Sequence, residues 1–200
     1  MNLADNPPAR QNRLYRIDST SAEMRLALEF PVAETPSARN PYAGMGLSYD
    51  CELHALWLSS VAGSSPGQER GKIFRIDLPT LKLSATLEDV DAFGLASFQS
   101  GAQQGLLFGS ARSSDLWWQA LSASGERIGA KQALLSIAAL GPMGNERVRK
   151  IEAAADGTLL LYGTPFHFNL AQPAANQPAT KYKFAWDQNT QSYRFVDWGK

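Results

Sequence analysis

The sequence has a single cysteine, Cys51, so no disulfide bond can form within one chain. This scarcity is typical of a reducing compartment, but many periplasmic proteins also lack disulfides, so cytoplasm and periplasm both stay open. The first twelve residues are polar, contain two prolines and lack the apolar core of a signal peptide. We expect residues 1–12 to form a flexible arm. No segment approaches the roughly 20 apolar residues of a membrane helix, so we expect no membrane partner.

The chain also lacks an excess of either charge, because 19 lysines and arginines balance 19 aspartates and glutamates. A protein that binds the phosphate backbone of a nucleic acid normally carries a basic excess. We therefore expect no nucleic-acid partner. A net charge near zero weakens the repulsion between copies of a protein, which makes self-association easier.

Catalytic and metal-binding motifs are scarce as well. Cys51 and His54 lie close in sequence, but a zinc site needs four ligands and the only other histidine is the distant His167. On a strand, Cys51 and His54 would point to opposite faces, so we interpret them as a turn residue and a buried strand histidine. There is no Gly-x-Ser-x-Gly motif and no phosphate-binding loop. We therefore expect no catalytic residue, no metal and no cofactor, and predict that the protein is not an enzyme.

One local cluster of carboxylates is present, at Glu88, Asp89 and Asp91. A general acid and base would need a second carboxylate across a cleft, which the sequence cannot place. We interpret the cluster as a solvated loop between two structural repeats.

What the sequence does contain is a repeated β-hairpin. In residues 72–90, a short apolar strand is followed by a turn at 77–80 and by a strand in which apolar and polar residues alternate. Residues 13–30, 115–134 and 181–198 repeat this pattern, and YRIDST in the first copy matches FRIDLPT. Asp18, Asp77 and Asp187 recur at equivalent turns, where the carboxylate is expected to accept a backbone N–H.

A strand pair precedes three of the four hairpins, which gives three complete repeats at residues 46–90, 92–134 and 147–198. A repeat of roughly 40–50 residues with four short strands is typical of a β-propeller blade. The chain resembles β-propeller repeat proteins at this level, without the motifs of a specific family. The resemblance implies an all-β fold of antiparallel four-stranded blades in a single domain, residues 13–200. A β-sandwich or meander is the alternative, and residues 132–141 could instead form a short helix.

The hairpin at residues 13–30 has no candidate for its own first and second strands, so we predict about three and a half blades. An open arc of this kind exposes sheet edges, which proteins normally cover or pair. A homodimer that joins two arcs through these edges, with seven blades in total, is one solution.

The segments between second and third strands and between repeats are long, at 31–46, 60–72, 109–115, 135–147 and 163–180. In a propeller they share one face, and binding residues are usually found on loops. Arginine and aromatic side chains are typical anchors of protein interfaces. The predicted partner-binding residues on this face are Arg39, Tyr42, Arg70, Arg112, Arg147, Phe166, His167 and Phe168. For the two phenylalanines, packing over the ends of the sheets is the competing interpretation.

These observations favour a non-enzymatic module that presents the loop-rich face to a protein partner. An inhibitor, such as a bacterial immunity protein, would fit the size and the missing catalytic motifs, although this step rests on analogy between folds. The alternatives are a propeller that binds or processes carbohydrate, and a structural module of a larger assembly.

Overall fold

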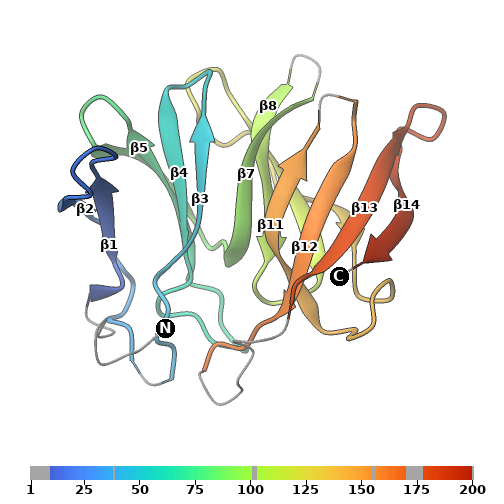
Figure 1. Ribbon diagram of the computed structural model, residues 1–200, viewed down its shortest axis with the longest axis horizontal. Helices are drawn as coiled ribbons and strands as arrows, with labels where there is room; N and C mark the ends of the chain where they lie inside the picture. Colours follow the sequence, from blue (N-terminus) through green and yellow to red (C-terminus); the bar gives the residue numbers. More distant parts are fainter. Residues whose placement is uncertain (1–9, 38, 101–102, 155, 170–177, 200) are drawn as a thin grey trace.

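The computed structural model describes residues 10–37, 39–100, 103–154, 156–169 and 178–199. These residues form an all-β fold (Figure 1). The expected arm at residues 1–12 lies mostly outside the described residues. In the described part of the chain, no helix is long and apolar enough to span a membrane.

The strands are β1 (Arg13–Ile17), β2 (Met24–Glu29), β3 (Gly44–Asp50), β4 (Ala55–Ser60), β5 (Lys72–Asp77), β6 (Lys82–Glu88), β7 (Ala92–Ser100), β8 (Gln103–Ser110), β9 (Asp115–Leu121), β10 (Gln132–Ser136), β11 (Glu146–Ala153), β12 (Leu159–Pro165), β13 (Thr180–Asp187) and β14 (Ser192–Gly199). Residues 132–141 therefore begin as a strand and do not form the alternative helix.

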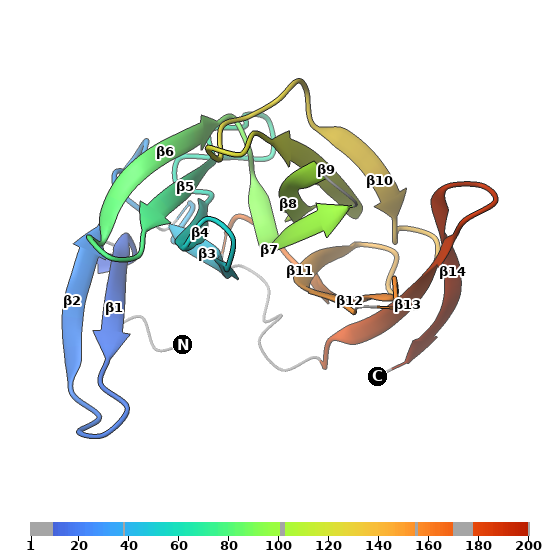
Figure 2. The same ribbon diagram turned by 90° about the horizontal axis from the view of Figure 1, so that it is seen from above.

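The strands form three four-stranded antiparallel sheets and one two-stranded sheet. The sheets are ordered β3-β4-β5-β6, β7-β8-β9-β10 and β11-β12-β13-β14, and β1 pairs only with β2. Viewed from above, they follow one another around an open arc, with β3, β7 and β11 on the inside (Figure 2). The all-β, propeller-like fold with three and a half blades is confirmed. We call the sheets blade 1, blade 2 and blade 3, and the β1–β2 pair the half-blade.

The repeated aspartates close the hairpin turns as expected. Asp18 accepts the backbone N–H of Thr20 at 3.0 Å, and Asp77 accepts that of Thr80 at 2.9 Å. Asp187 accepts the backbone N–H of Asn189 at 2.9 Å. The pKa of Asp18 is lowered mainly by the hydrogen bond from the backbone N–H of Ser21, and the pKa of Asp77 is lowered by hydrogen bonds from the hydroxyl and the backbone N–H of Thr80. The turns lie on the side of the arc opposite the long loops (Figure 1).

One sequence interpretation in this region is wrong. His54 is exposed and lies in the turn between β3 and β4, with a φ of 45°. Its side chain therefore does not take part in the strand core. The physical reason is that the turn extends through residues 51–54, so β4 begins one residue later than the apolar pattern indicated.

The hydrophobic core is divided into layers between neighbouring sheets. Phe30 and Phe74 belong to the layer between the half-blade and blade 1. Trp57 and Phe108 belong to the layer between blades 1 and 2, and Tyr182 to the layer between blades 2 and 3. Each sheet is thus stabilised mainly by its two neighbours, and a sheet without one neighbour leaves apolar surface exposed.

Blades 2 and 3 approach closely through glycine. A Cβ atom added at Gly109 of β8 would lie 2.1 Å from the backbone oxygen of Val148 on β11. A Cβ atom added at Gly94 of β7 would lie 2.6 Å from the carbonyl carbon of Arg149. The two glycines let backbone pack on backbone near the centre of the arc.

Candidate functional site on the loop-rich face

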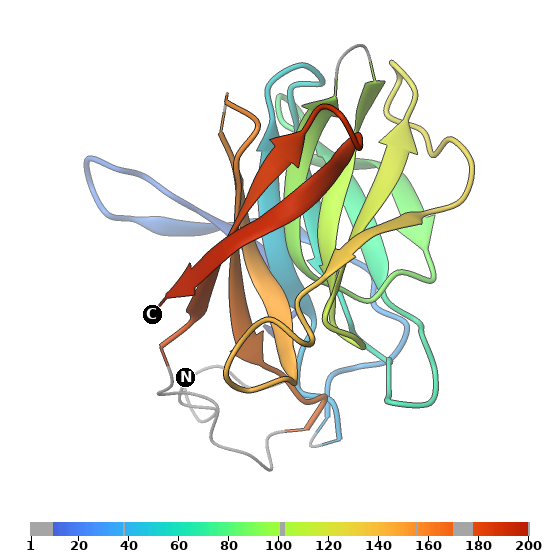
Figure 3. The ribbon, with the colours of Figure 1, turned by 90° about the vertical axis from the view of Figure 1, so that its right-hand side faces the viewer.

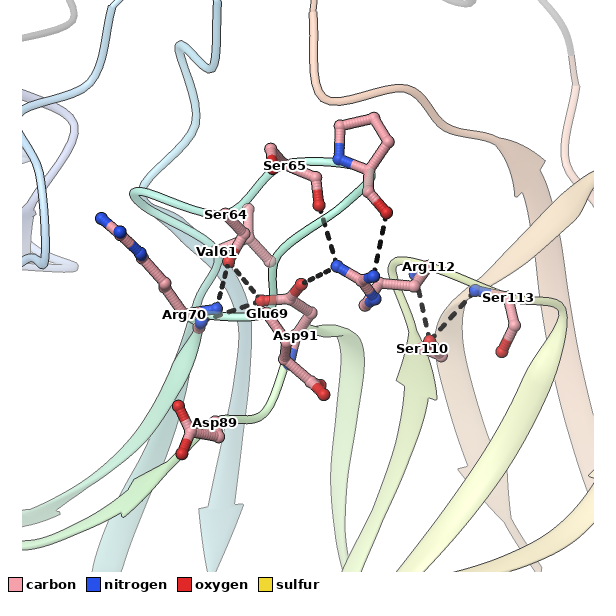
Figure 4. A network of polar contacts seen from close by, with 12 residues as sticks. Val61, Ser64, Ser65, Glu69, Arg70, Asp89, Asp91, Ser110, Arg112 and Ser113 are labelled. Carbon is pink, nitrogen blue, oxygen red and sulfur yellow. Dashed lines mark hydrogen bonds and ion pairs between the residues drawn. The ribbon is translucent and has the colours of Figure 1, made fainter.

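The loop-rich face contains a buried carboxylate at the junction between blades 1 and 2. Asp91 immediately precedes β7, and its side chain lies among residues of the loop 61–71 and of the loop after β8 (Figure 4). The side chain of Asp91 is fully buried. Because an ionised carboxylate loses hydration when it is buried, burial raises the pKa of Asp91.

Two donors from the loop 61–71 bind Oδ1 of Asp91. The hydroxyl of Ser64 donates one hydrogen bond, and the backbone N–H of Gly71 donates another at 2.8 Å. A Cβ atom at Gly71 would lie 2.4 Å from the same oxygen, so the loop backbone can reach the carboxylate only with glycine at this position. Ser64 also accepts the backbone N–H of Arg70 at 3.0 Å. The carboxylate therefore holds both ends of the loop.

Arg112 holds the middle of the same loop. One guanidinium nitrogen lies 3.5 Å from Oδ2 of Asp91 and donates a hydrogen bond to the carbonyl of Ser65 at 2.8 Å. The other terminal nitrogen donates to the carbonyl of Pro66 at 2.9 Å. This guanidinium joins the buried carboxylate to an exposed turn, residues 65–68, which is closed by backbone hydrogen bonds between Ser65 and Gln68.

Glu69 and Lys131 connect the loop to blade 2. The carboxylate of Glu69 accepts the backbone N–H of Asp91 at 2.9 Å. Lys131 pairs with Glu69 at 3.1 Å and lies 5.5 Å from the ring centre of Trp117. Glu69 therefore connects the loop 61–71 to two parts of blade 2. One is the residue before β7, and the other is Lys131, which precedes β10.

An aromatic cluster packs behind these loops. The ring of Phe166 lies 4.7 Å from that of Phe93, 5.3 Å from that of Tyr42 and 5.3 Å from that of Phe168. Phe166 and Phe168 are buried. Burial also raises the pKa of the Tyr42 hydroxyl. These side chains cover the ends of the sheets, and their aromatic surface faces the interior.

The structure places the other expected residues in different environments. Arg39 and His167 are exposed on the loops. Arg70 pairs with Glu34 at the surface. Arg147 donates to the Ser114 hydroxyl at 2.9 Å, and burial lowers its pKa.

Sequence analysis missed the central residue of this site. Asp91 was interpreted as part of a solvated acidic loop, but only 1 % of its surface is exposed. A usable signal was its position between two apolar residues, Val90 and Ala92, immediately before an inner strand. Asp89, two residues before Asp91, is exposed, as expected.

No protein-family model matches the chain, and no curated protein matches its sequence. Solved structures share the fold. A luciferin-regenerating enzyme superposes with a TM-score of 0.61 at 15% identity over 100% of this chain. A nidogen/laminin complex gives 0.56 at 13% identity over 96%, and the periplasmic gluconolactonase of Pseudomonas aeruginosa gives 0.50 at 11% identity over 94%. The chain spans 60–63% of the length of these three chains.

These likenesses show a propeller-type fold that is used by protein-binding proteins and by enzymes. The prediction that the protein is not an enzyme is wrong as a conclusion from fold and motifs, because most neighbours of this fold are named as enzymes. Propeller enzymes assemble their sites from separate blades, so a short sequence motif is not required for activity.

Proposed function

We propose that the loop-rich face binds a protein partner, with the exposed turn at residues 65–68 near its centre. The observation that carries this proposal is the bracing of an exposed turn by a buried carboxylate and a guanidinium. A loop that is already ordered loses little conformational entropy when a partner binds. Arg39 and the Arg70–Glu34 pair lie on loops of the same face and supply charged groups for recognition.

The expected result of a binding experiment follows from this geometry. Immobilised protein should retain a stoichiometric partner from the native extract, and the combined change Arg39→Glu and Gln68→Glu should lower the affinity for that partner by about tenfold or more. Both side chains are exposed, so the fold should be unchanged. The affinity is measured by calorimetry with the isolated partner.

The matched control is Lys82→Glu, an exposed charge reversal beside the tight turn of blade 1. If Lys82→Glu weakens the complex and the double variant does not, the partner binds the opposite face. An inhibitor or immunity protein would need a face of this kind. An assay of the partner's own activity with and without this protein decides that role.

A second candidate function, carbohydrate binding, is favoured by an aromatic groove between blades 2 and 3. The groove has a volume of about 310 Å³ and is lined by Phe98, Trp118, Trp186 and Tyr193, among others. Trp186 is 42% exposed and lies 5.1 Å from Tyr193 between ring centres. An exposed indole beside other aromatic rings offers a stacking surface for the apolar face of a sugar.

If sugars bind in this groove, soluble gluco- or xylo-oligosaccharides should quench tryptophan fluorescence in a saturable manner. Trp186→Ala should weaken this binding by about tenfold or more. Trp198→Ala is the matched control, because Trp198 is equally exposed but lies outside the groove. Equal losses in the two variants would contradict binding at the groove.

A further inference from the structure

Among the described residues, the half-blade lacks the first and second strands that blades 1, 2 and 3 contain. In blades 1, 2 and 3 the third strand pairs with a second strand, as β5 pairs with β4, β9 with β8 and β13 with β12. The strand β1 corresponds to a third strand, and among the described residues it pairs only with β2. The other edge of β1 is therefore open toward the inside of the arc (Figure 2).

A comparison of the first strands of the three blades shows which apolar side chain is exposed beside the half-blade. Leu47, Leu95 and Ile151 are equivalent, because each lies three residues after the start of a β-bulge in the first strand of its blade. Leu95 and Ile151 are 7% and 8% exposed, since the preceding blade covers them. Leu47 is 51% exposed, because the described residues contain no inner strands in the preceding half-blade.

The half-blade has apolar side chains on both faces of its hairpin. Its register pairs Leu14 with Leu28 on one face, whereas Tyr15 with Leu26 and Ile17 with Met24 share the other face, because Leu14 and Tyr15 are successive residues of β1. Leu14 and Leu28 pack on blade 1, whereas Ile17 is 64% exposed. The hairpin projects from the body of the arc (Figure 3). A groove of about 280 Å³ between β1 and β3 is lined by Leu14, Tyr15 and Leu47, among others.

The backbone of β1 is oriented for strand addition. The N–H of Asp18 donates to the carbonyl of Glu23 on the β2 side. Alternate residues of a strand direct their backbone groups to opposite sides, so Tyr15 and Ile17 direct their N–H and C=O groups to the open edge. An incoming strand would find backbone partners there and apolar contacts on Leu47.

Charge around the groove indicates the chemistry of the occupant. Arg10 and Arg13 line it, and Arg16 follows on β1. Glu29 is the acidic partner of Arg13. A strand with carboxylates near these arginines would be favoured over a basic strand.

We propose that the vacant half of the first blade binds an antiparallel β-hairpin of another protein, apolar on one face and acidic where it meets Arg10 and Arg13. This surface is separate from the loop-rich face. A second copy that paired through the same edge would carry its own blade 1 on the same side of the joined sheet. The two copies of blade 1 would then occupy one space, which favours a different protein as the occupant.

The test uses the full chain and two synthetic hairpins. Both peptides have the sequence of residues 44–60 with Cys51→Ser, because this segment is the inner strand pair of blade 1. One carries Ser59→Glu and Ser60→Glu, and the other carries Ser59→Lys and Ser60→Lys. These positions end the second strand and would lie near Arg10 and Arg13. We expect the glutamate peptide to bind about tenfold tighter or more and to slow hydrogen exchange at Tyr15 and Ile17.

Two variants of the chain locate the binding. Ile17→Pro removes an N–H at the open edge and should abolish binding, whereas Ile17→Ala keeps the N–H and should retain it. Leu47→Lys alters the exposed surface of β3 and should weaken binding by about tenfold or more. Leu78→Lys, at an exposed leucine of a tight turn, should have no effect.

Several outcomes would overturn the proposal. They are no binding at peptide concentrations of about 1 mM, equal binding to Ile17→Pro and wild type, or slowed exchange at β6, β10 or β14 in place of β1. Light scattering that shows a dimer of the chain, converted to a monomer by Ile17→Pro, would identify a second copy as the occupant and would also overturn it.

Discussion

Replacing Asp91 by alanine is expected to lower the free energy of unfolding by about 2–3 kcal/mol. The change leaves the backbone N–H of Gly71 and the hydroxyl of Ser64 without their acceptor in a buried place. Arg112 also loses its ion-pair partner, but because this guanidinium is partly exposed, that loss contributes less. Urea unfolding measures the change. Hydrogen exchange should accelerate at residues 64–71, since the carboxylate holds both ends of this loop.

The control for this variant is Asp197→Ala, which removes an exposed carboxylate from β14 and should alter stability by less than about 0.5 kcal/mol. If Asp91→Ala and Asp197→Ala had the same small effect, the network around Asp91 would not organise the loop. An unchanged exchange rate at residues 64–71 would lead to the same conclusion.

The carboxylate of Asp91 also makes the stability of the protein depend on pH. The pKa of Asp91 in the folded protein is raised above the ordinary value of 3.8, so the folded state retains this proton to a higher pH than the unfolded state. Its contribution to stability is present below 3.8 and is lost as the pH rises through the folded-state pKa. Wild type should therefore lose stability relative to Asp91→Asn, which cannot ionise, as the pH rises above 3.8.

Gly109→Ala should destabilise the protein by about 3 kcal/mol or prevent folding. The new methyl group would lie 2.1 Å from the backbone oxygen of Val148 and 2.5 Å from its Cβ atom. Backbone atoms of β11 cannot move without separating blades 2 and 3, so the contact cannot be relieved locally. Thermal unfolding and the recovery of soluble protein measure the effect.

Gly67→Ala is the matched control, because nothing lies within 4 Å of a Cβ atom at Gly67. Its stability should differ from wild type by less than about 0.5 kcal/mol. Equal stability of the two variants would mean that β8 and β11 are not held in close backbone contact.

The order of strands could be predicted because the sequence of each hairpin contains its own strand alternation and turn residues. The alternation from Leu81 to Leu87 and the aspartate turns at Asp18 and Asp77 depend on neighbouring residues, and the structure confirms them. The half-blade was predictable for the same reason, since residues 1–12 offered no apolar alternation. The turn at His54 was misread, because a short apolar run does not show where a strand begins.

The candidate site was less predictable, because burial depends on which segments meet in space. Arg112 was predicted to bind a partner, and the structure shows that it braces a loop. Phe166 is buried, which agrees with the competing interpretation that it packs over the ends of the sheets. The role of both residues in binding stays a prediction. Asp91 was taken as solvated, since nothing in the sequence shows that Ser64 and Gly71 reach it. Arg39 and His167 lie exposed on the loops, and their role in binding stays a prediction.

By itself, the sequence determined an all-β chain of repeated hairpins with one incomplete copy, because strand period and turn chemistry are local properties. Only the tertiary structure decided which carboxylate is buried and which leucine is left uncovered. Leu47 and Leu95 occupy the same place in their repeats, yet one is exposed and the other buried. The difference arises because the burial of a strand face depends on the neighbouring sheet, and in the described part of the chain the neighbour of Leu47 has only its outer half.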